Sequence, residues 1–468
     1  MAVCFTRQRE FTRLALIAYE LAMRAAENHT LLTDLYQLTM AQAYFREQRT
    51  ATATFSLFIR SYPPDRGFFV AAGLQDVLEY LESLSFDTAA IDFLASQKLF
   101  SPNFLDYLAC LRFTGQVWAI PEGKIFFADE PIIEVTAPII EAQIVETFII
   151  NQVHMQTLVA TKAARCAHAA GGRPVVDFAL RRTHGSDAGM KVARASYIAG
   201  FAGTSNVKAG QRYGIPLVGT MAHSFVSSFE REIDAFRAYV ASFPSNAVLL
   251  IDTYDTVAGA KAAAQVGLEM AERGHKLVGV RLDSGDMASL SVEVRRILDS
   301  AGLKDTKIIG SGGLDEFELA QLSAVSAPFD SYGVGTKMGV SADQPWTDIA
   351  YKLVEYDNRP VLKLSSGKSS WPGRKQLFRL KDDHGQPRRD IIGLRDEDLS
   401  GQRMLQEVMR DGKTTAPYPS LAEMRDLFAG ELAAIPENVK ALRQPSRFPV
   451  EFSAQLRALR EQTAKTIG

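Results

Sequence analysis

The sequence has few of the residues that build disulfide frameworks and zinc sites. It contains 3 cysteines in 468 residues, and Cys4, Cys110 and Cys166 are far apart with no CxxC spacing. This pattern argues against a knuckle-type zinc site and against a fold stapled by disulfides. Isolated thiols are typical of a reducing compartment. The sequence therefore predicts a cytoplasmic protein.

Long apolar runs and an excess of one charge are also missing. No uninterrupted apolar segment approaches the ~20 residues of a membrane span. The formal net charge is −2, so no global basic field favours nucleic acid or a membrane surface, and any basic site must be local. Segment 11–27 resembles a signal peptide only faintly, because Glu20, Arg24 and Glu27 interrupt it. We expect an amphipathic helix there.

The length of the chain suggests two domains. We expect an N-terminal α+β domain over 1–145, with the C-terminal segment 351–468 packing on it. The apolar spacing predicts its elements. These are a helix over 31–48 capped by Thr33, a strand over 51–61, a helix over 74–84, short strands over 114–137, a helix opened by Pro138 and reaching about 170, β-structure over 351–380, a loop over 383–391 and helix from about 420.

Residues 146–350 show a different rhythm, in which strand-like and helix-like segments alternate from Pro174 to about 340. Helices are expected over 256–273 and 289–302, between short apolar runs. Such alternation predicts parallel strands, and its length suits a barrel better than a short open sheet. We expect an α/β fold: an irregular α/β barrel beside the α+β domain.

Each apolar run of this region ends in residues suited to a phosphorylated substrate. In barrels the reactive residues lie at the carboxyl ends of the strands, so these residues should meet at one rim. They are His223 after 215–218, Asp252 and Asp255 after 248–251, Arg281, Asp283 and Asp286 after 277–280, the turn 310–313 after Ile308 and Ile309, Gly333, Gly335 and Thr336 on the last run, and Arg181 at the end of a strand over 178–182.

Two glycine-rich turns indicate phosphate binding. Gly312 and Gly313 precede a predicted helix, and Gly333 and Gly335 occupy the next strand end. Glycine lets backbone N–H groups approach an anion, and a helix N-terminus adds a favourable dipole. Each turn alone is equally well explained as a tight connection between strand and helix. The pairing of the two favours a phosphate site.

The charged residues of this rim also have two explanations. Arg281 offers a fork of donors for a carboxylate, while Asp283 and Asp286 suit sugar hydroxyls or Mg²⁺. An ion pair at a barrel rim is the alternative. Arg181 is either a second substrate contact or a structural partner of a nearby carboxylate. The neighbouring Asp252 and Asp255 add to the cluster, which favours a functional role.

His223 is the most informative residue, because it lies beside a glycine turn and two hydroxyls. A lone histidine is usually structural, but imidazole at a strand end is a competent nucleophile toward phosphoryl groups and a competent acid or base. A local basic stretch, made by Lys363, Lys368, Arg374 and Lys375, is either a solvated loop or a loop reaching over the phosphates.

Several blocks between about 31 and 380 together resemble nicotinate phosphoribosyltransferases, in the order found in that family. No single GxG piece carries the resemblance, and the chain before 31 and most of it past 395 lie outside it. The cysteine cluster of some members is missing. The blocks are 32–40 (LTDLYQLTM), 178–182 (FALRR), 205–207 (SNV), 219–225 (GTMAHSF), 279–286 (GVRLDSGD), 333–336 (GVGT) and 372–376 (PGRKQ).

The resemblance implies that 5-phosphoribosyl 1-diphosphate and nicotinate give nicotinate mononucleotide and diphosphate, in NAD biosynthesis, with Mg²⁺ as cofactor and ATP as co-substrate. It implies transient phosphorylation of His223 and nicotinate binding by Thr220 and Arg281. It also implies that Thr336 binds the phosphoribosyl group and that Tyr36 stacks on the pyridine ring, often from the other subunit of a homodimer. We add Arg181 to the nicotinate contacts from its position in the sequence alone. Asp283, as a catalytic residue, and the 310–313 turn are further additions of this kind.

Three alternatives stay open at this point. A sister enzyme would use nicotinamide or quinolinate, although quinolinate chemistry needs no phosphorylated histidine and the amide needs no arginine. A sensor of phosphoribosyl ligands would keep the fold without turnover, which His223, Asp283 and Asp286 argue against. An aldolase-like barrel is disfavoured, because no lysine at a strand end lies in a clearly apolar setting.

Overall fold

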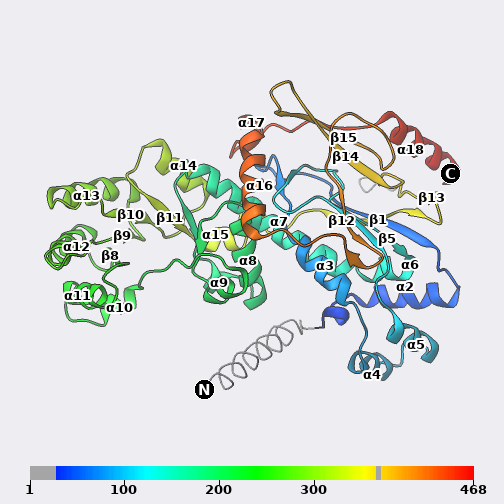
Figure 1. Ribbon diagram of the computed structural model, residues 1–468, viewed down its shortest axis with the longest axis horizontal. Helices are drawn as coiled ribbons and strands as arrows, with labels where there is room; N and C mark the ends of the chain where they lie inside the picture. Colours follow the sequence, from blue (N-terminus) through cyan, green and yellow to red (C-terminus); the bar gives the residue numbers. More distant parts are fainter. Residues whose placement is uncertain (1–27, 365–369, 468) are drawn as a thin grey trace, which may run out of the picture.

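The computed structural model describes residues 28–364 and 370–467. The helix expected over 11–27 and the predicted loop residue Lys368 lie outside them. Figure 1 shows two parts joined along the long helix α7 (Glu146–Ala169): an α/β part, drawn in green, and a part that combines the blue and cyan N-terminal segment with the orange C-terminal segment. Each part has its own apolar core. The α/β fold with an additional domain is thus confirmed.

The N-terminal and C-terminal segments share one antiparallel sheet, so neither could complete it alone. β1 pairs with β5 on one side and with β12 on the other. β3 then pairs with β17, a strand contributed by the C-terminal segment. In sheet order the strands are β13 (Arg359–Pro360), β12 (Ile349–Tyr356), β1 (Thr52–Ile59), β5 (Ile133–Pro138), β3 (Gln116–Ala119), β17 (Gln406–Arg410) and β18 (Lys413–Thr414).

A second, four-stranded sheet lies in the C-terminal segment, and it corrects one prediction. Residues 383–391 are not simply a loop, because β15 begins at Pro387. Asp382 accepts from the backbone N–H of His384 and Gln386 and closes a turn at Gly385. In the strand that follows, Arg388 is exposed, whereas Pro387 and Asp390 are buried. The strands are β16 (Gln402–Arg403), β14 (Lys375–Lys381), β15 (Pro387–Leu394) and β19 (Val450–Phe452), and the helices are α16 (Leu421–Ala434), α17 (Glu437–Lys440) and α18 (Ala454–Ile467).

The helices of the N-terminal segment differ from the prediction at two ends. Thr33 does not cap its helix: Asp34 is the N-cap residue, and the Thr33 hydroxyl donates to the carbonyl of Ile144. Pro138 ends β5, and the helix after it breaks at Val145. The elements are η1 (His29–Leu31), α2 (Leu35–Arg46), β2 (Phe69–Val70), α3 (Leu74–Ser83), α4 (Thr88–Ser96), α5 (Pro102–Cys110), β4 (Ile125–Phe126), α6 (Ile139–Ile144) and α7.

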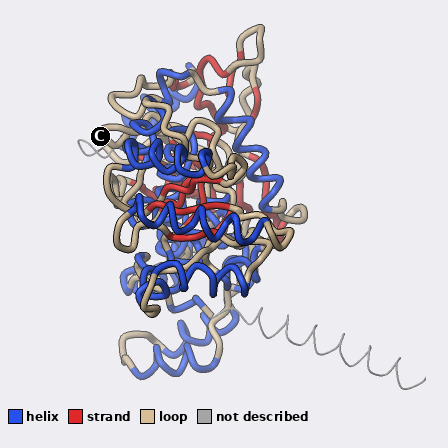
Figure 2. The backbone as a smooth tube through the Cα atoms, turned by 90° about the vertical axis from the view of Figure 1, so that its left-hand side faces the viewer, coloured by secondary structure: helices blue, strands red, loops and turns tan. Residues whose placement is uncertain are grey.

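The α/β part contains a six-stranded sheet in which every pairing is parallel, as predicted. Figure 2 views this part from outside and shows its helices lying around the strands. The segment at Leu217 bridges to Thr204 in β7, and no ladder between described residues joins β7 to β8. The strand pairings alone therefore do not close the sheet, and the irregular barrel stays a prediction. The strand order is β7 (Gly203–Thr204), β6 (Val175–Asp177), β11 (Ser331–Val334), β10 (Lys307–Gly310), β9 (Gly279–Leu282) and β8 (Val248–Leu250).

Two runs of this part were wrongly predicted as strands. Residues 215–218 form only the bridge at Leu217, since Pro216 has no N–H to donate. Residues 178–182 are not a strand either, because β6 ends at Asp177. The helices are η2 (Leu180–Arg182), α8 (Ser186–Ile198), α9 (Val207–Tyr213), α10 (His223–Ser227), α11 (Glu232–Ser242), α12 (Thr256–Ala271), α13 (Met287–Ser300), α14 (Glu316–Ala324) and α15 (Thr336–Gly339). In the part of the chain that the structure describes, no helix is both long and apolar enough to cross a membrane.

Candidate active site

The carboxyl ends of the parallel strands bring most of the predicted residues to one rim. Thr253 follows β8, Asp283 follows β9 and Ser311 follows β10. Because neighbouring parallel strands end on the same edge, side chains at these positions lie within reach of one another.

His223 is the first residue of α10, and both of its ring nitrogens face strand ends. Nδ1 lies 3.1 Å from the hydroxyl oxygen of Thr253. Nε2 lies 3.9 Å from Oδ2 of Asp283, which is too long for a hydrogen bond. The imidazole is 44 % exposed, so Nε2 remains accessible to a reactant. The ring is oriented by one neighbour and open on its other side.

Asp283 is fixed by a network that the sequence did not reveal. The hydroxyl of Ser311 donates to its Oδ1. Beneath it, the buried carboxylate of Asp252 accepts from the backbone N–H of Asp283 at 3.1 Å and from the hydroxyl of Ser284 at 2.6 Å. The carboxylate of Asp283 therefore has one oxygen occupied and one turned toward His223. Asp252 supports the loop and does not itself contact the imidazole ring by a hydrogen bond.

Arg281 lies on the same rim and is largely removed from water. Its NH1 donates to the hydroxyl of Thr220 at 2.6 Å, and its Nε is buried without an acceptor among the described residues. Burial lowers the pKa of Arg281, and the nearby positive charge of Arg181 lowers it further. The carboxylates of Asp283 and Asp252 oppose this shift. A guanidinium has five N–H donors. A bound carboxylate would satisfy donors that the protein leaves free.

The glycine turns next to these residues have structural reasons of their own. Gly312 has φ +88°, and a Cβ there would lie 1.7 Å from the carbonyl oxygen of Asp283. A Cβ on Gly333 would collide with the ring of Phe178. Gly313 has φ +68°, and a Cβ there would meet no atom within 4 Å, so its surroundings are open. Gly335 and Thr336 lie at the start of the short helix α15.

Other predicted residues are placed differently. Asp286 is the N-cap residue of α13 and binds Ser289, and Asp255 caps α12 in the same way. Arg181 lies on η2 near Arg281. Tyr36 lies on α2, in the other part of the molecule from β8–β11 (Figure 1), so a single chain does not bring it to His223.

The predicted basic loop is not a loop over this rim. Lys375 is buried in β14, where its ammonium lies 3.1 Å from the carboxylate of Glu134. Arg374 pairs with Glu355 on β12. Both acidic partners lie on strands of the seven-stranded antiparallel sheet, a contact between distant segments that local sequence cannot reveal. The sequence left two explanations open, a solvated loop and a loop over the phosphates, and neither holds for the buried Lys375, while Arg374 is engaged with a strand residue.

Glu232, on α11, was missed by the sequence analysis. Burial raises the pKa of its carboxyl from an ordinary value of 4.5 to about 7, and the charges of Asp252 and Asp255 add to the rise. Its Oε1 is buried with no partner among the described residues. Nothing in its local sequence signals this setting, because the two aspartates belong to the segment that follows β8.

Glu232→Gln is expected to flatten the pH dependence of stability. Between pH 4.5 and about 7 the folded protein holds a proton that the unfolded chain releases, so the free energy of unfolding falls as pH rises through that window. Glutamine does not titrate and removes this slope. Urea unfolding of both proteins at pH 5 and pH 8 measures it, and parallel pH dependence in the two would contradict the assignment.

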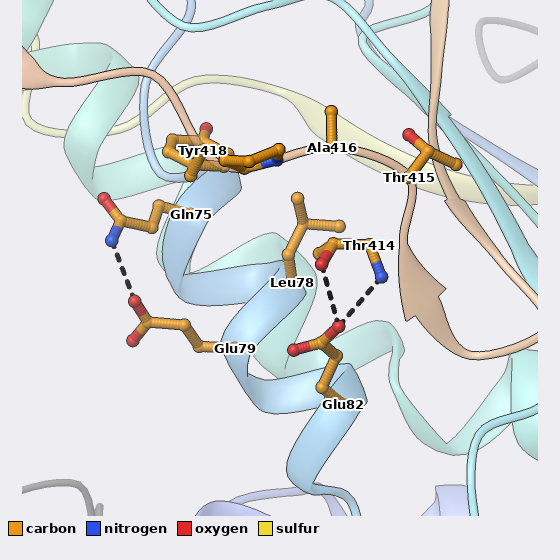
Figure 3. Close-up of a pocket in the computed structure, with 9 residues that line it drawn as sticks. Gln75, Leu78, Glu79, Glu82, Thr414, Thr415, Ala416 and Tyr418 are labelled. Carbon is orange, nitrogen blue, oxygen red and sulfur yellow. Dashed lines mark hydrogen bonds between the residues drawn. The ribbon is translucent and has the colours of Figure 1, made fainter.

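A separate cavity of about 500 Å³ lies between α3 and residues 414–418 (Figure 3). Glu82 of α3 accepts there from the hydroxyl and backbone N–H of Thr414. None of the residues at the rim of β8–β11 lines this cavity. We place the candidate active site at the rim, where the predicted residues meet, and not in this cavity.

Most of the chain is similar to one family of proteins. Three family models match in order: the nicotinate phosphoribosyltransferase N-terminal domain over 31–154, the nicotinate phosphoribosyltransferase family over 174–387 and the nicotinate phosphoribosyltransferase C-terminal domain over 399–460. The third match corrects the expectation that the resemblance ends near residue 395.

Individual proteins give the same result. A nicotinate phosphoribosyltransferase of Mycobacterium tuberculosis is 47 % identical over 91 % of this chain and 92 % of its own length. One from Bacillus subtilis is 37 % identical over 91 % of this chain and 93 % of its length. The crystal structure of human nicotinic acid phosphoribosyltransferase superposes with a TM-score of 0.83 at 30 % identity, covering 92 % of this chain and 99 % of that one.

Proposed function

Because the chain belongs to the nicotinate phosphoribosyltransferase family, we propose that it transfers the 5-phosphoribosyl group of 5-phosphoribosyl 1-diphosphate to nicotinate. The products are nicotinate mononucleotide and diphosphate, and the reaction belongs to NAD biosynthesis. The observation that carries this proposal is Arg281, a mostly buried guanidinium with a single hydrogen bond, to Thr220, among the described residues. An anionic pyridine carboxylate is the ligand it suits best.

The two substrates would occupy adjacent parts of the rim. Arg281 and Thr220 hold the nicotinate carboxylate, with Arg181 adding positive charge from η2. The turns that contain Gly312, Gly313, Gly333, Gly335 and Thr336 offer backbone N–H groups to the phosphates. This arrangement would direct the ring nitrogen at the ribose carbon that loses diphosphate. Holding two reactants in such a geometry supplies much of the rate increase.

ATP coupling would use His223. With Nδ1–H donating to Thr253, the lone pair of Nε2 is the free nucleophile. Nε2 attacks the γ-phosphorus of ATP, a P–N bond forms, and ADP leaves with the electrons of the broken P–O bond. Hydrolysis of the phosphohistidine later releases phosphate. Asp283, on the Nε2 side of the ring, would stabilise the positive charge that develops on the imidazole as the P–N bond forms.

Mg²⁺ would reach the site with its substrates. Among residues 28–364 and 370–467, no three His, Cys, Asp or Glu side chains are grouped as metal ligands. Mg²⁺ is commonly held by one or two carboxylates together with substrate phosphates. Asp283 is the rim carboxylate that fits such a role, while Asp286 is engaged with Ser289. When bound, Mg²⁺ neutralises charge on the departing diphosphate.

A homodimer would bring Tyr36 to the pyridine ring. Tyr36 is 48 % exposed and lies beside the exposed Leu32 and Leu35, an apolar surface that a second copy of the chain would cover. We propose a cytoplasmic homodimer with shared sites, consistent with three isolated cysteines.

Mixing Tyr36→Ala chains with Arg281→Ala chains tests the shared site. Subunit exchange is expected to restore part of the activity, because one site of each mixed dimer then has both native residues. Product formation before and after exchange is the measurement. Mixed dimers no more active than the parent variants would contradict the arrangement.

The substrate is tested by assaying nicotinate, nicotinamide and quinolinate with labelled 5-phosphoribosyl 1-diphosphate, with and without ATP. Product from nicotinate, increased by ATP, is the expected outcome. Turnover of nicotinamide alone or release of CO₂ from quinolinate would replace this function with that of a sister enzyme. Binding without product over long incubation would indicate a sensor instead.

A further inference from the structure

Buried charges lie beneath the two glycine turns and connect four segments of the chain. Three of the cations, Lys162, Arg165 and Arg66, have side chains no more than 1 % exposed. Lys162 and Arg165 lie on α7, and Arg66 lies in the turn before β2. Figure 1 shows α7, α14 and α15 meeting where the two parts of the molecule join. The rim is thus supported from the N-terminal domain.

The acidic partners come from the segments that follow the turns. Glu316 at the start of α14 lies 2.5 Å from Lys162 and 3.0 Å from Arg165. Asp343, beyond α15, lies 3.0 Å from Lys162 and 3.1 Å from Arg66. Charges this deeply buried persist only when they are paired, so the network fixes both segments against α7.

Three residues closer to the surface join the turns directly. Asp315, the N-cap residue of α14, follows Gly313 by two positions, and Lys337 comes immediately after Thr336. The ammonium of Lys337 lies 2.8 Å from Glu318 and 3.6 Å from Asp315. Asp315 is also 3.6 Å from Lys162. We call Asp315, Glu318 and Lys337 the clasp.

We propose that the clasp is a positioning device for 5-phosphoribosyl 1-diphosphate, and that Lys337 and Glu318 are positioning residues that set the spacing between the 310–313 and 333–336 turns. This inference rests on the proposed function, because it assumes that both turns bind phosphates of one substrate. Lys337 pairs with two carboxylates, so its contribution is to hold the two turns at a fixed spacing. Small displacements of such groups cost catalytic efficiency.

A double-mutant cycle with Lys337→Met and Glu318→Gln tests the clasp. The side chains are 39 % and 41 % exposed, so both variants should fold, and glutamine can still accept from the N–H of Asp315, which Glu318 now does at 2.9 Å. Each single change is expected to raise the KM for 5-phosphoribosyl 1-diphosphate by about 5-fold, as for loss of a partly exposed ion pair. The KM for nicotinate should not change.

The double variant should be no worse than either single variant, because both remove the same interaction. Lys337→Arg, in contrast to Lys337→Met, should keep the KM for 5-phosphoribosyl 1-diphosphate of the unmodified protein. Lys307→Met is the matched control: Lys307 pairs with Asp330 at 3.0 Å, at the opposite end of β10, and its loss should leave both KM values unchanged.

Two results would overturn the proposal. An unchanged KM for 5-phosphoribosyl 1-diphosphate in Lys337→Met would show that the clasp does not position this substrate. A raised KM in Lys337→Met with an unchanged or lower KM in Glu318→Gln means that Lys337 binds phosphate itself. Failure of the proposed function is a separate result, absence of product in the unmodified protein. In that case calorimetric binding of 5-phosphoribosyl 1-diphosphate to the same variants still tests the clasp.

Discussion

Arg281→Ala is expected to raise the KM for nicotinate by two to three orders of magnitude. Its guanidinium is mostly buried and donates only to Thr220 within the described residues, so the nicotinate carboxylate would become its principal acceptor. Removing one partner of a buried charge pair costs about 2–5 kcal/mol, and each 1.4 kcal/mol is about tenfold. The KM for 5-phosphoribosyl 1-diphosphate should change much less.

Initial rates with each substrate varied in turn measure this effect. Arg296→Ala is the matched control, because Arg296 is an exposed residue of α13 whose partner is Glu293. Arg281→Lys should recover only part of the loss, since an ammonium keeps the charge but not the planar fork. An unchanged KM for nicotinate in Arg281→Ala would remove this residue from the site.

His223→Ala is expected to abolish stimulation by ATP while a slow, ATP-independent transfer remains. The contacts of Arg281 and the glycine turns do not include the imidazole, so the substrates should still bind. Without Nε2 there is no nucleophile to accept the γ-phosphoryl group. Initial rates with and without ATP, together with ADP released per product, give the measurement.

His275→Ala serves as the control, since His275 is exposed after α12 and away from the rim residues. It should keep both the ATP stimulation and the ratio of ADP to product. If His223→Ala were stimulated by ATP as strongly as the unmodified protein, the phosphohistidine step would be wrong, whatever the effect on the basal rate.

Strands β8 to β11 of the α/β part were predictable because each is a short apolar run with glycine, aspartate or arginine at or just after its end. β9 and its Arg281 are an example. The prediction failed where a side chain ended a strand early. Asp177 accepts from the N–H of Ala179 and from the hydroxyl of Thr204, both at 2.7 Å. The chain therefore turns into η2 and carries Arg181 with it.

Contacts between distant segments could not be predicted. Alternation identified β1 as a strand but not its partner β12, about three hundred residues later. Likewise Thr253 and Ser311 follow strand ends, which hinted at the rim, yet their contacts with His223 and Asp283 depend on the order of the strands. Local sequence fixes periodicity and turn chemistry, whereas strand order is decided by the packing of the whole chain.

A crystal structure of the protein with nicotinate mononucleotide and diphosphate would show directly whether the rim is the active site. We expect the pyridine carboxylate on Arg281 and Thr220, and phosphate groups against Gly312, Gly313 and Thr336, with His223 beside them. A product molecule bound in the cavity between α3 and residues 414–418, with no contact to Arg281, would contradict this assignment.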